Sequence, residues 1–221
     1  MRVLLSIAAV PVLLFGWLTW SEHSFEHRLQ PIASQIAGRE IAVDCQSFLG
    51  SLVDVQAREG EVRFDASGRP EPRIFLTRTT CKRLKAFAGH AHHRELDCLA
   101  GLDWALPDAL SFTEPCYREA ADTIYAVLIL AHESYHARGV SEEATANCDA
   151  TQTMAWTAHE LGADADEAEL VARAMEALEQ RQDEPYGTTQ CHAGLALDLH
   201  PETPDFPTEH PLAPPLTGSS D

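Results

Sequence analysis

The stretch that decides the fold is HESYH at residues 132–136, and Glu143 follows it shortly afterwards. Residues four apart lie on one face of a helix, so His132 and His136 can offer two imidazole nitrogens to a single metal ion. Glu133 follows His132 directly, where it can take a proton from a water molecule beside that ion. The spacing fixes only three positions, so the interpretation depends on the sequence around it.

The segment before this stretch predicts a buried helix. Residues 116–131 contain neither Gly nor Pro, and residues 124–131 are apolar all round, which is typical of a helix inside a protein core. Pro115 suits the first turn of such a helix, and Gly139 suits the position just past its end. We therefore expect both histidines on the last turns of a central, buried helix.

A second helix is expected from Ser141, as its N-cap, to Leu161. Counting by three and four from Glu143 gives a mostly apolar stripe that includes Asn147, whereas the same count from Glu142 gives a more polar face. A carboxylate on the buried face needs a partner, because an unpaired buried charge is costly, and a metal ion is one such partner. We therefore predict Glu143, rather than Glu142, as the third metal ligand.

The pattern of residues 132–136 followed by Glu143-x-x-Ala146-Asn147 resembles the gluzincin metallopeptidases. In the HtpX-type membrane peptidases a downstream Glu-x-x-Ala-Asp supplies the third zinc ligand, and zinc proteins of the ImmA/IrrE type carry a similar Glu-Ala-Asn segment. The resemblance covers residues 128–161. It implies a zincin-like fold, with Glu133 as the general base and with zinc held by His132, His136 and Glu143.

Two supporting roles stay open at this stage. Metal-bound histidines usually donate their second ring nitrogen to a carboxylate or carbonyl, and Asn147 is one candidate for this orienting role. A peptidase also needs a hydrogen-bond donor for the oxyanion that forms on the scissile carbonyl. The sequence does not rank the candidates for it, which are Tyr135, His159, Tyr186 and His192.

The N-terminus predicts a membrane segment. Residues 3–20 carry no charge and, at about 1.5 Å per helical residue, reach about 27 Å, which just spans a bilayer core. Arg2 precedes the segment and Glu22 follows it, an order that places the N-terminus in the cytoplasm and the rest outside. No small-residue cleavage pattern is evident, so we expect a single-pass anchor over residues 1–21, with a cleaved signal peptide and a secreted protein as the alternative.

Six cysteines follow this segment, and none forms a CxxC pair. An even number of cysteines in an exported chain predicts three disulfides, and the connectivity stays open. One possibility joins the ends of the two central helices through Cys116 and Cys148, and the alternative is buried free thiols. The disulfide candidates are Cys45, Cys81, Cys98, Cys116, Cys148 and Cys191.

The remaining segments predict a mainly α domain with a small β-hairpin. We expect a polar, helical connector over residues 22–39 and a stapled zincin-like domain over residues 40–198. Within the domain, helical patterns cover residues 41–55, 79–88 and 164–180, and two alternating runs at 61–65 and 73–76 predict the hairpin. HAHH at residues 90–93 is expected as a solvated loop, with a second metal site as the less favoured interpretation, and the Pro-rich tail, 199–221, is expected to be disordered.

The net charge of −18 argues against nucleic acid or anionic lipid as a partner. We predict a membrane-anchored, extracytoplasmic zinc-dependent hydrolase, most simply a metallopeptidase that acts on a peptide or protein. The alternative is a non-catalytic binding or structural module, held by a structural metal or by its disulfides. A structural site would be closed by a fourth protein ligand, such as His159 or a residue of the HAHH stretch, whereas a catalytic site keeps an open position.

Overall fold

The structure is a computed structural model, and it describes residues 23–47, 59–89, 96–100, 115–179, 185–203, 206–208 and 210–211. The predicted membrane segment, the HAHH stretch and most of the predicted tail lie outside these ranges. Among the helices that are described, none combines the length and the apolar character needed to cross a bilayer.

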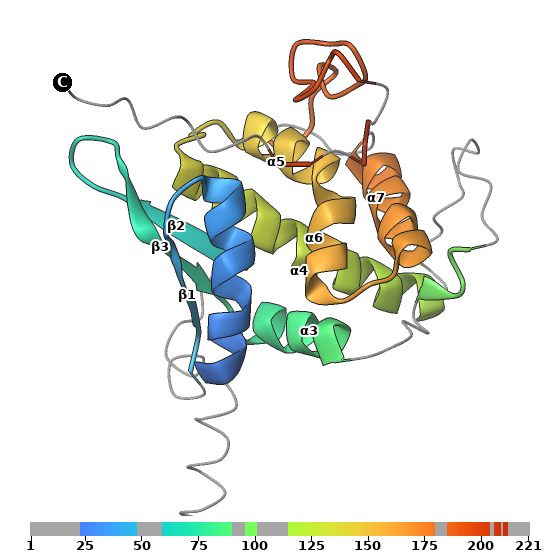
Figure 1. Cartoon of the computed structure of the whole chain (residues 1–221), viewed down its shortest axis with the longest axis horizontal. Helices are drawn as coiled ribbons and strands as arrows, with labels where there is room; N and C mark the ends of the chain where they lie inside the picture. Colours follow the sequence, from blue (N-terminus) through green and yellow to red (C-terminus); the bar gives the residue numbers. More distant parts are fainter. Residues whose placement is uncertain are drawn as a thin grey trace, which may run out of the picture.

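The described part of the chain is mainly helical with one small sheet, which confirms the predicted fold class at this level (Figure 1). A helix over residues 23–37 comes first. The elements that follow are β1 (Ala42–Cys45), β2 (Gly60–Phe64), β3 (Pro70–Leu76), α3 (Arg78–Gly89), α4 (Pro115–Arg138), α5 (Glu143–Gln152), α6 (Met154–Leu161) and α7 (Ala165–Glu179).

The three strands form one sheet in the order β1-β3-β2. β2 and β3 pair antiparallel, as the hairpin pattern predicts, and β1 runs parallel to β3. The helix expected from residue 41 is therefore wrong for its first residues, while residues 48–55 lie outside the described part. Ile41 and Val43 are buried and Ala42 and Asp44 are only half-buried, so the side chains alternate between two faces as in a strand.

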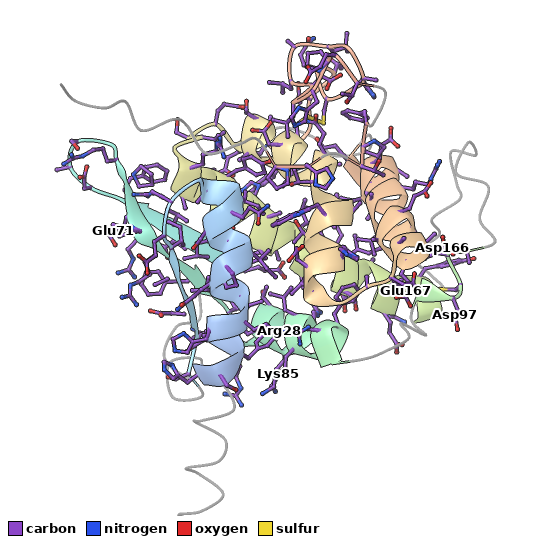
Figure 2. All side chains as sticks on the ribbon, viewed as in Figure 1. Arg28, Glu71, Lys85, Asp97, Asp166 and Glu167 are labelled. Atoms are coloured by element: carbon purple, nitrogen blue, oxygen red, sulfur yellow. A yellow bond between two sulfur atoms is a disulfide. The ribbon has the colours of Figure 1, made fainter. Side chains whose placement is uncertain are left out.

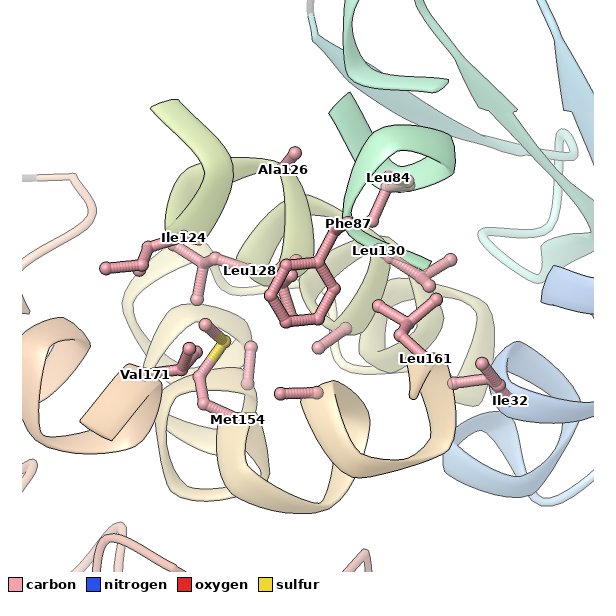
Figure 3. Close-up of a cluster of buried hydrophobic side chains, with 14 of the residues drawn as sticks. Ile32, Leu84, Phe87, Ile124, Ala126, Leu128, Leu130, Met154, Leu161 and Val171 are labelled. Carbon is pink, nitrogen blue, oxygen red and sulfur yellow. The ribbon is translucent and has the colours of Figure 1, made fainter. Parts of the chain in front are cut away.

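α4 is the central helix, and the other layers pack around it. Its residues Val127 and Leu130 have no exposed surface, in agreement with the apolar pattern. Figure 3 shows Phe87 of α3, Met154 of α6 and Val171 of α7 converging on this helix. The two ends of α4 lie where the sequence predicts them: the helix starts at Pro115, and Gly139 just past its end has a φ of 114°.

The helix over residues 23–37 is part of the core rather than a polar connector. Leu29 and Ile36 are fully buried, and Ile32 reaches the cluster drawn in Figure 3. Arg28 fixes the helix by donating to the carbonyls of Ala88 and Leu161, each at 2.8 Å, and Figure 2 shows it beside α3. Only the apolar face of this helix is buried. The polar residues on its other face explain why the composition of the segment predicts a polar connector.

Two disulfides tie the sheet and the C-terminal segment to the helices. Cys45 at the end of β1 bonds to Cys81 of α3, and Cys148 of α5 bonds to Cys191. Pairing of Cys148 with Cys116 is therefore wrong. None of the described cysteines is free, so the prediction of disulfides is confirmed for this part of the chain.

The single helix expected up to Leu161 is broken at Thr153, between α5 and α6. The Thr153 hydroxyl donates to the backbone carbonyls of Asp149 and Ala150, and its N–H is shared between the same two carbonyls. This local bonding replaces the regular helical ladder and bends the chain. Beyond α6, the capping box of Asp164 and Glu167 forms as predicted, and Figure 2 labels Glu167 at the start of α7.

Candidate metal centre

The structure brings the three predicted ligands together. Nε2 of His132 lies 3.1 Å from Oε2 of Glu143, and Nε2 of His136 lies 3.3 Å from the same oxygen. The two imidazole rings are perpendicular, with centroids 4.5 Å apart. One atom from each residue lies within 4.8 Å of the others, so the cluster can hold a metal ion, as predicted.

The turn between α4 and α5 places Glu143 opposite the histidines. The N–H of Gly139 bonds to the carbonyl of His136, so the chain reverses within one turn. Glu142, rather than the predicted Ser141, is the N-cap of α5: its carboxylate accepts the N–H groups of Ala144 at 3.3 Å and Thr145 at 2.6 Å. Glu142 is thereby engaged, which leaves Glu143 to face the histidines.

The hydrogen bonds of His136 show why a cation fits this cluster. Its Nδ1 lies 2.6 Å from the carbonyl oxygen of Val140, which can only accept, so the proton of a neutral ring resides on Nδ1. Nε2 then presents a lone pair toward the carboxylate of Glu143. Two acceptor atoms that face each other repel unless a cation lies between them, so the donor set suits a metal ion.

His132 is also prepared to act as a neutral ligand. Burial, and after it the neighbouring His136, lower the pKa of His132 to about 4, against the opposing effect of Glu143. Its Nδ1 is buried without a hydrogen-bond partner, which leaves Nε2 as the nitrogen that faces the cluster. A neutral imidazole is the form that binds metals.

Glu133 lies beside the three clustered side chains, in a pocket of about 680 Å³. The residue is buried, with 7% of its surface exposed. The backbone of β2 passes directly over it at Gly60, where a Cβ atom would meet Cγ of Glu133 at 2.6 Å. β2 therefore forms one wall of the pocket, and Tyr186 of the C-terminal segment also lines it.

The structure separates the four candidates for an oxyanion donor. Tyr186 is the one that lines the pocket; its ring lies 6.3 Å from that of His132, and 45% of its surface is exposed. Tyr135 is fully buried in the core, and His159 is exposed on α6 with its Nδ1 on the carbonyl of Ala163. His192 does not line the pocket.

Asn147 lines the pocket and connects α5 to α7 and to the C-terminal segment. Its amide donates to the carboxylate of Glu179 and to the carbonyl of Tyr186 at 3.4 Å, and these two bonds involve neither histidine. For His136, the carbonyl of Val140 accepts a hydrogen bond from Nδ1 and so orients the ring. Burial raises the pKa of Glu179 to about 7, against the lowering effect of the Asn147 bond.

The sequence reasoning missed three of these groups: Gly60, the Val140 carbonyl and Glu179. An isolated glycine at the start of a strand can signal a close backbone approach, so Gly60 carried a usable signal. Glu179 comes directly after Leu178, which lies on the apolar face of α7, and this is a weaker sequence signal. The Val140 carbonyl has no side-chain signal, because any residue provides it.

The chain matches no protein-family model, no curated protein and no solved structure.

Proposed function

We propose that the chain is a zinc-dependent hydrolase, most simply a peptidase of the gluzincin type. One observation carries the proposal: two imidazole nitrogens and a carboxylate oxygen converge in a pocket that also contains the buried carboxylate of Glu133. Three nitrogen and oxygen ligands with room for a fourth are the usual set of a catalytic zinc site.

Each residue has a chemical task in this proposal. His132, His136 and Glu143 hold the ion, which when bound supplies a Lewis acid for the water molecule and the scissile carbonyl. Glu133 accepts a proton from the attacking water and later returns it to the leaving amine. The Tyr186 hydroxyl donates a hydrogen bond to the oxyanion.

The edge of β2 supports an extended peptide as the substrate. The N–H of Thr77 donates to the carbonyl of Glu59. In an antiparallel pair every second residue hydrogen-bonds to the partner strand, so Glu59 and Glu61 direct their backbone N–H and C=O groups to β3. Gly60 and Val62 then direct theirs toward the other edge, which no strand covers in the described part of the chain. Both residues line the pocket, so a peptide can add there as a further strand.

The open pocket favours catalysis over a purely structural metal. A structural zinc site is closed by four protein ligands. Within the described residues no fourth His, Cys, Asp or Glu joins the cluster, and His159 bonds to the Ala163 carbonyl instead. Residues 90–93, the other candidates for closure, lie outside the described part.

We also propose that the domain is extracytoplasmic, anchored through the N-terminal segment. Disulfides persist in oxidising compartments and are rare in the cytosol. The bonds Cys45–Cys81 and Cys148–Cys191 tie together four separate elements of the domain, so they favour folding outside the cytoplasm.

Metal content and peptide cleavage by the parent and three variants test the proposal. We expect about one zinc per chain at this site in the parent and in Glu133→Gln, and little in His136→Ala. Cleavage of an unstructured protein should require Glu133, and Tyr186→Phe should lower kcat by about 100-fold without loss of zinc. A folded parent that binds no zinc would refute the metal centre. Bound zinc with equal cleavage by the parent and Glu133→Gln would refute catalysis and favour the structural module.

A further inference from the structure

We propose that His23 and His27 form a second, surface binding site for a divalent transition-metal ion of the class that prefers imidazole nitrogen, with zinc as the representative. Both residues are exposed on the helix over residues 23–37. In Figure 1 the first part of this helix lies in the lower half of the view, whereas α5, which carries Glu143, lies in the upper half. The proposal does not depend on the hydrolase function.

The first observation is the direction of the two rings. His23 and His27 are four residues apart on the helix, and their Nε2 atoms lie 3.0 Å from each other. Two nitrogens bound to one zinc at about 2.0–2.1 Å, with a tetrahedral angle, are about 3.3 Å apart. Small side-chain rotations therefore suffice to place an ion between the two rings.

The second observation is that the other nitrogen of each ring is already engaged. Nδ1 of His23 lies 3.2 Å from a carboxylate oxygen of Glu26, and Nδ1 of His27 lies 3.2 Å from the side-chain oxygen of Gln30. This is the arrangement in which metal-binding histidines are usually held, with the second nitrogen donating to an oxygen. It directs both Nε2 lone pairs to the same point.

Glu26 is itself fixed by the fold. Its second carboxylate oxygen accepts the backbone N–H of Cys45 at 2.9 Å, and its side chain is only 16% exposed. Cys45 ends β1 and is bonded to Cys81, so the carboxylate is attached to the sheet rather than to a mobile surface. The ring of His23 is thus oriented by a partly buried group, which an accidental pair of surface histidines would lack.

The pair repeats the arrangement of the main metal centre. The ring centroids of His23 and His27 are 4.4 Å apart at 73°, compared with 4.5 Å and 89° for His132 and His136. Within the described residues no third His, Cys, Asp or Glu side chain joins the surface pair. We therefore expect a two-nitrogen chelate whose remaining positions hold water, weaker than the three-ligand site but selective for the same class of ion.

The metal-free chain has a hydrogen-bonded alternative. Turning the Gln30 amide allows Nε2 of His27 to donate to Nε2 of His23, because an amide oxygen and nitrogen can exchange places. Zinc binding would require the other tautomer of His27, in which the same proton lies on Nδ1 and is donated to the Gln30 side-chain oxygen. Binding would also link two successive turns of the helix, which stabilises the folded chain by mass action.

Chemical modification of the full-length chain tests the site residue by residue. Diethyl pyrocarbonate acylates a free imidazole nitrogen, and mass spectrometry gives the rate at each histidine. At a zinc concentration about ten times the dissociation constant, modification of His23 and His27 should slow about tenfold, because only the metal-free fraction reacts. His159, exposed and alone on α6, is the internal control and should keep its rate.

A single variant separates the surface site from the main centre. In His27→Gln, zinc should no longer slow modification of His23, while any protection of His132 and His136 persists. Three results would overturn the proposal: equal rates at His23 with and without zinc in the parent, protection of His23 that survives His27→Gln, or equal slowing at His159. Failure of zinc to protect His132 would count against the main centre only.

Discussion

Replacement of Gly60 by alanine tests how closely β2 and the proposed general base are packed. The added Cβ would lie 2.6 Å from Cγ of Glu133, 2.8 Å from its Oε1 and 2.8 Å from Cγ2 of Ile129. Contacts this short do not persist, so at least one group has to move. Ile129 is β-branched on a helix and has little rotamer freedom, so the movement falls on Glu133 and β2.

The expected magnitude follows from that displacement. Overpacking a core typically costs about 1–3 kcal/mol, and a chain of this size loses about 2–4 °C in Tm per kcal/mol, so Tm should fall by about 2–12 °C. A shift of about 1 Å in a reacting group can cost about 100-fold in rate. Gly60→Ala should therefore lower peptide cleavage by one to two orders of magnitude, while zinc content stays that of the parent.

The matched control is Gly89→Ala at the end of α3, where the added Cβ meets no atom within 4 Å. Both variants are compared with the parent by thermal unfolding, zinc content and cleavage of an unstructured protein. Gly89→Ala should resemble the parent in all three. Parent-like cleavage and Tm in Gly60→Ala would refute the close approach of β2 to Glu133, and a selective loss of zinc would show that Gly60 supports the ligands instead.

Two further predictions concern the disulfides and a buried carboxyl. The disulfides Cys148–Cys191 and Cys45–Cys81 span sequence separations of 43 and 36, so removing either one should lower the free energy of unfolding by about 4 kcal/mol. Only the loss of Cys148–Cys191 should lower cleavage beyond its effect on folding, because this bond holds the segment that carries Tyr186. Equal losses of cleavage in the two variants would contradict this. Burial raises the pKa of Asp149 to about 7, so the folded chain retains a proton that the unfolded chain loses, and stability falls as pH rises from about 4 to 7. Asp149→Asn should therefore raise denaturant stability at about pH 8 by roughly 2–4 kcal/mol and match the parent near pH 4, and an unchanged pH profile would rule out this role.

The three side chains of the candidate metal cluster could be predicted because they are close in sequence. His132 and His136 depend only on helical spacing, and Glu143 depends on a short turn whose glycine is visible in the sequence. Local rules also predicted the hairpin and the helix α7. The prediction of Ser141 as the N-cap of α5 was wrong. Serine is a preferred N-cap residue, but in the folded turn the Glu142 carboxylate accepts the N–H groups at the start of the helix.

The walls of the pocket could not be predicted, because they depend on pairings across long distances in sequence. β2 lies near Glu133 as the edge of a sheet whose other edge is β1, and the sequence pattern predicts a helix where β1 lies. Tyr186 could not be ranked, because its position depends on the Asn147 bond and on the nearby Cys148–Cys191 bond. Neither contact leaves a periodic signal in the sequence.

The clustered side chains and the walls of the pocket are held in place in different ways. The candidate ligands His132, His136 and Glu143 lie on α4 and α5, which share one turn and a buried interface, so they need no cross-link to stay together. The two walls come from the sheet and from the C-terminal segment, and each of these is joined to the helices by one disulfide, Cys45–Cys81 and Cys148–Cys191. Full reduction should therefore loosen the walls before the ligands. On this reasoning reduced protein keeps its zinc under conditions in which cleavage is already lost, and simultaneous loss of both would show that the site unfolds as one unit.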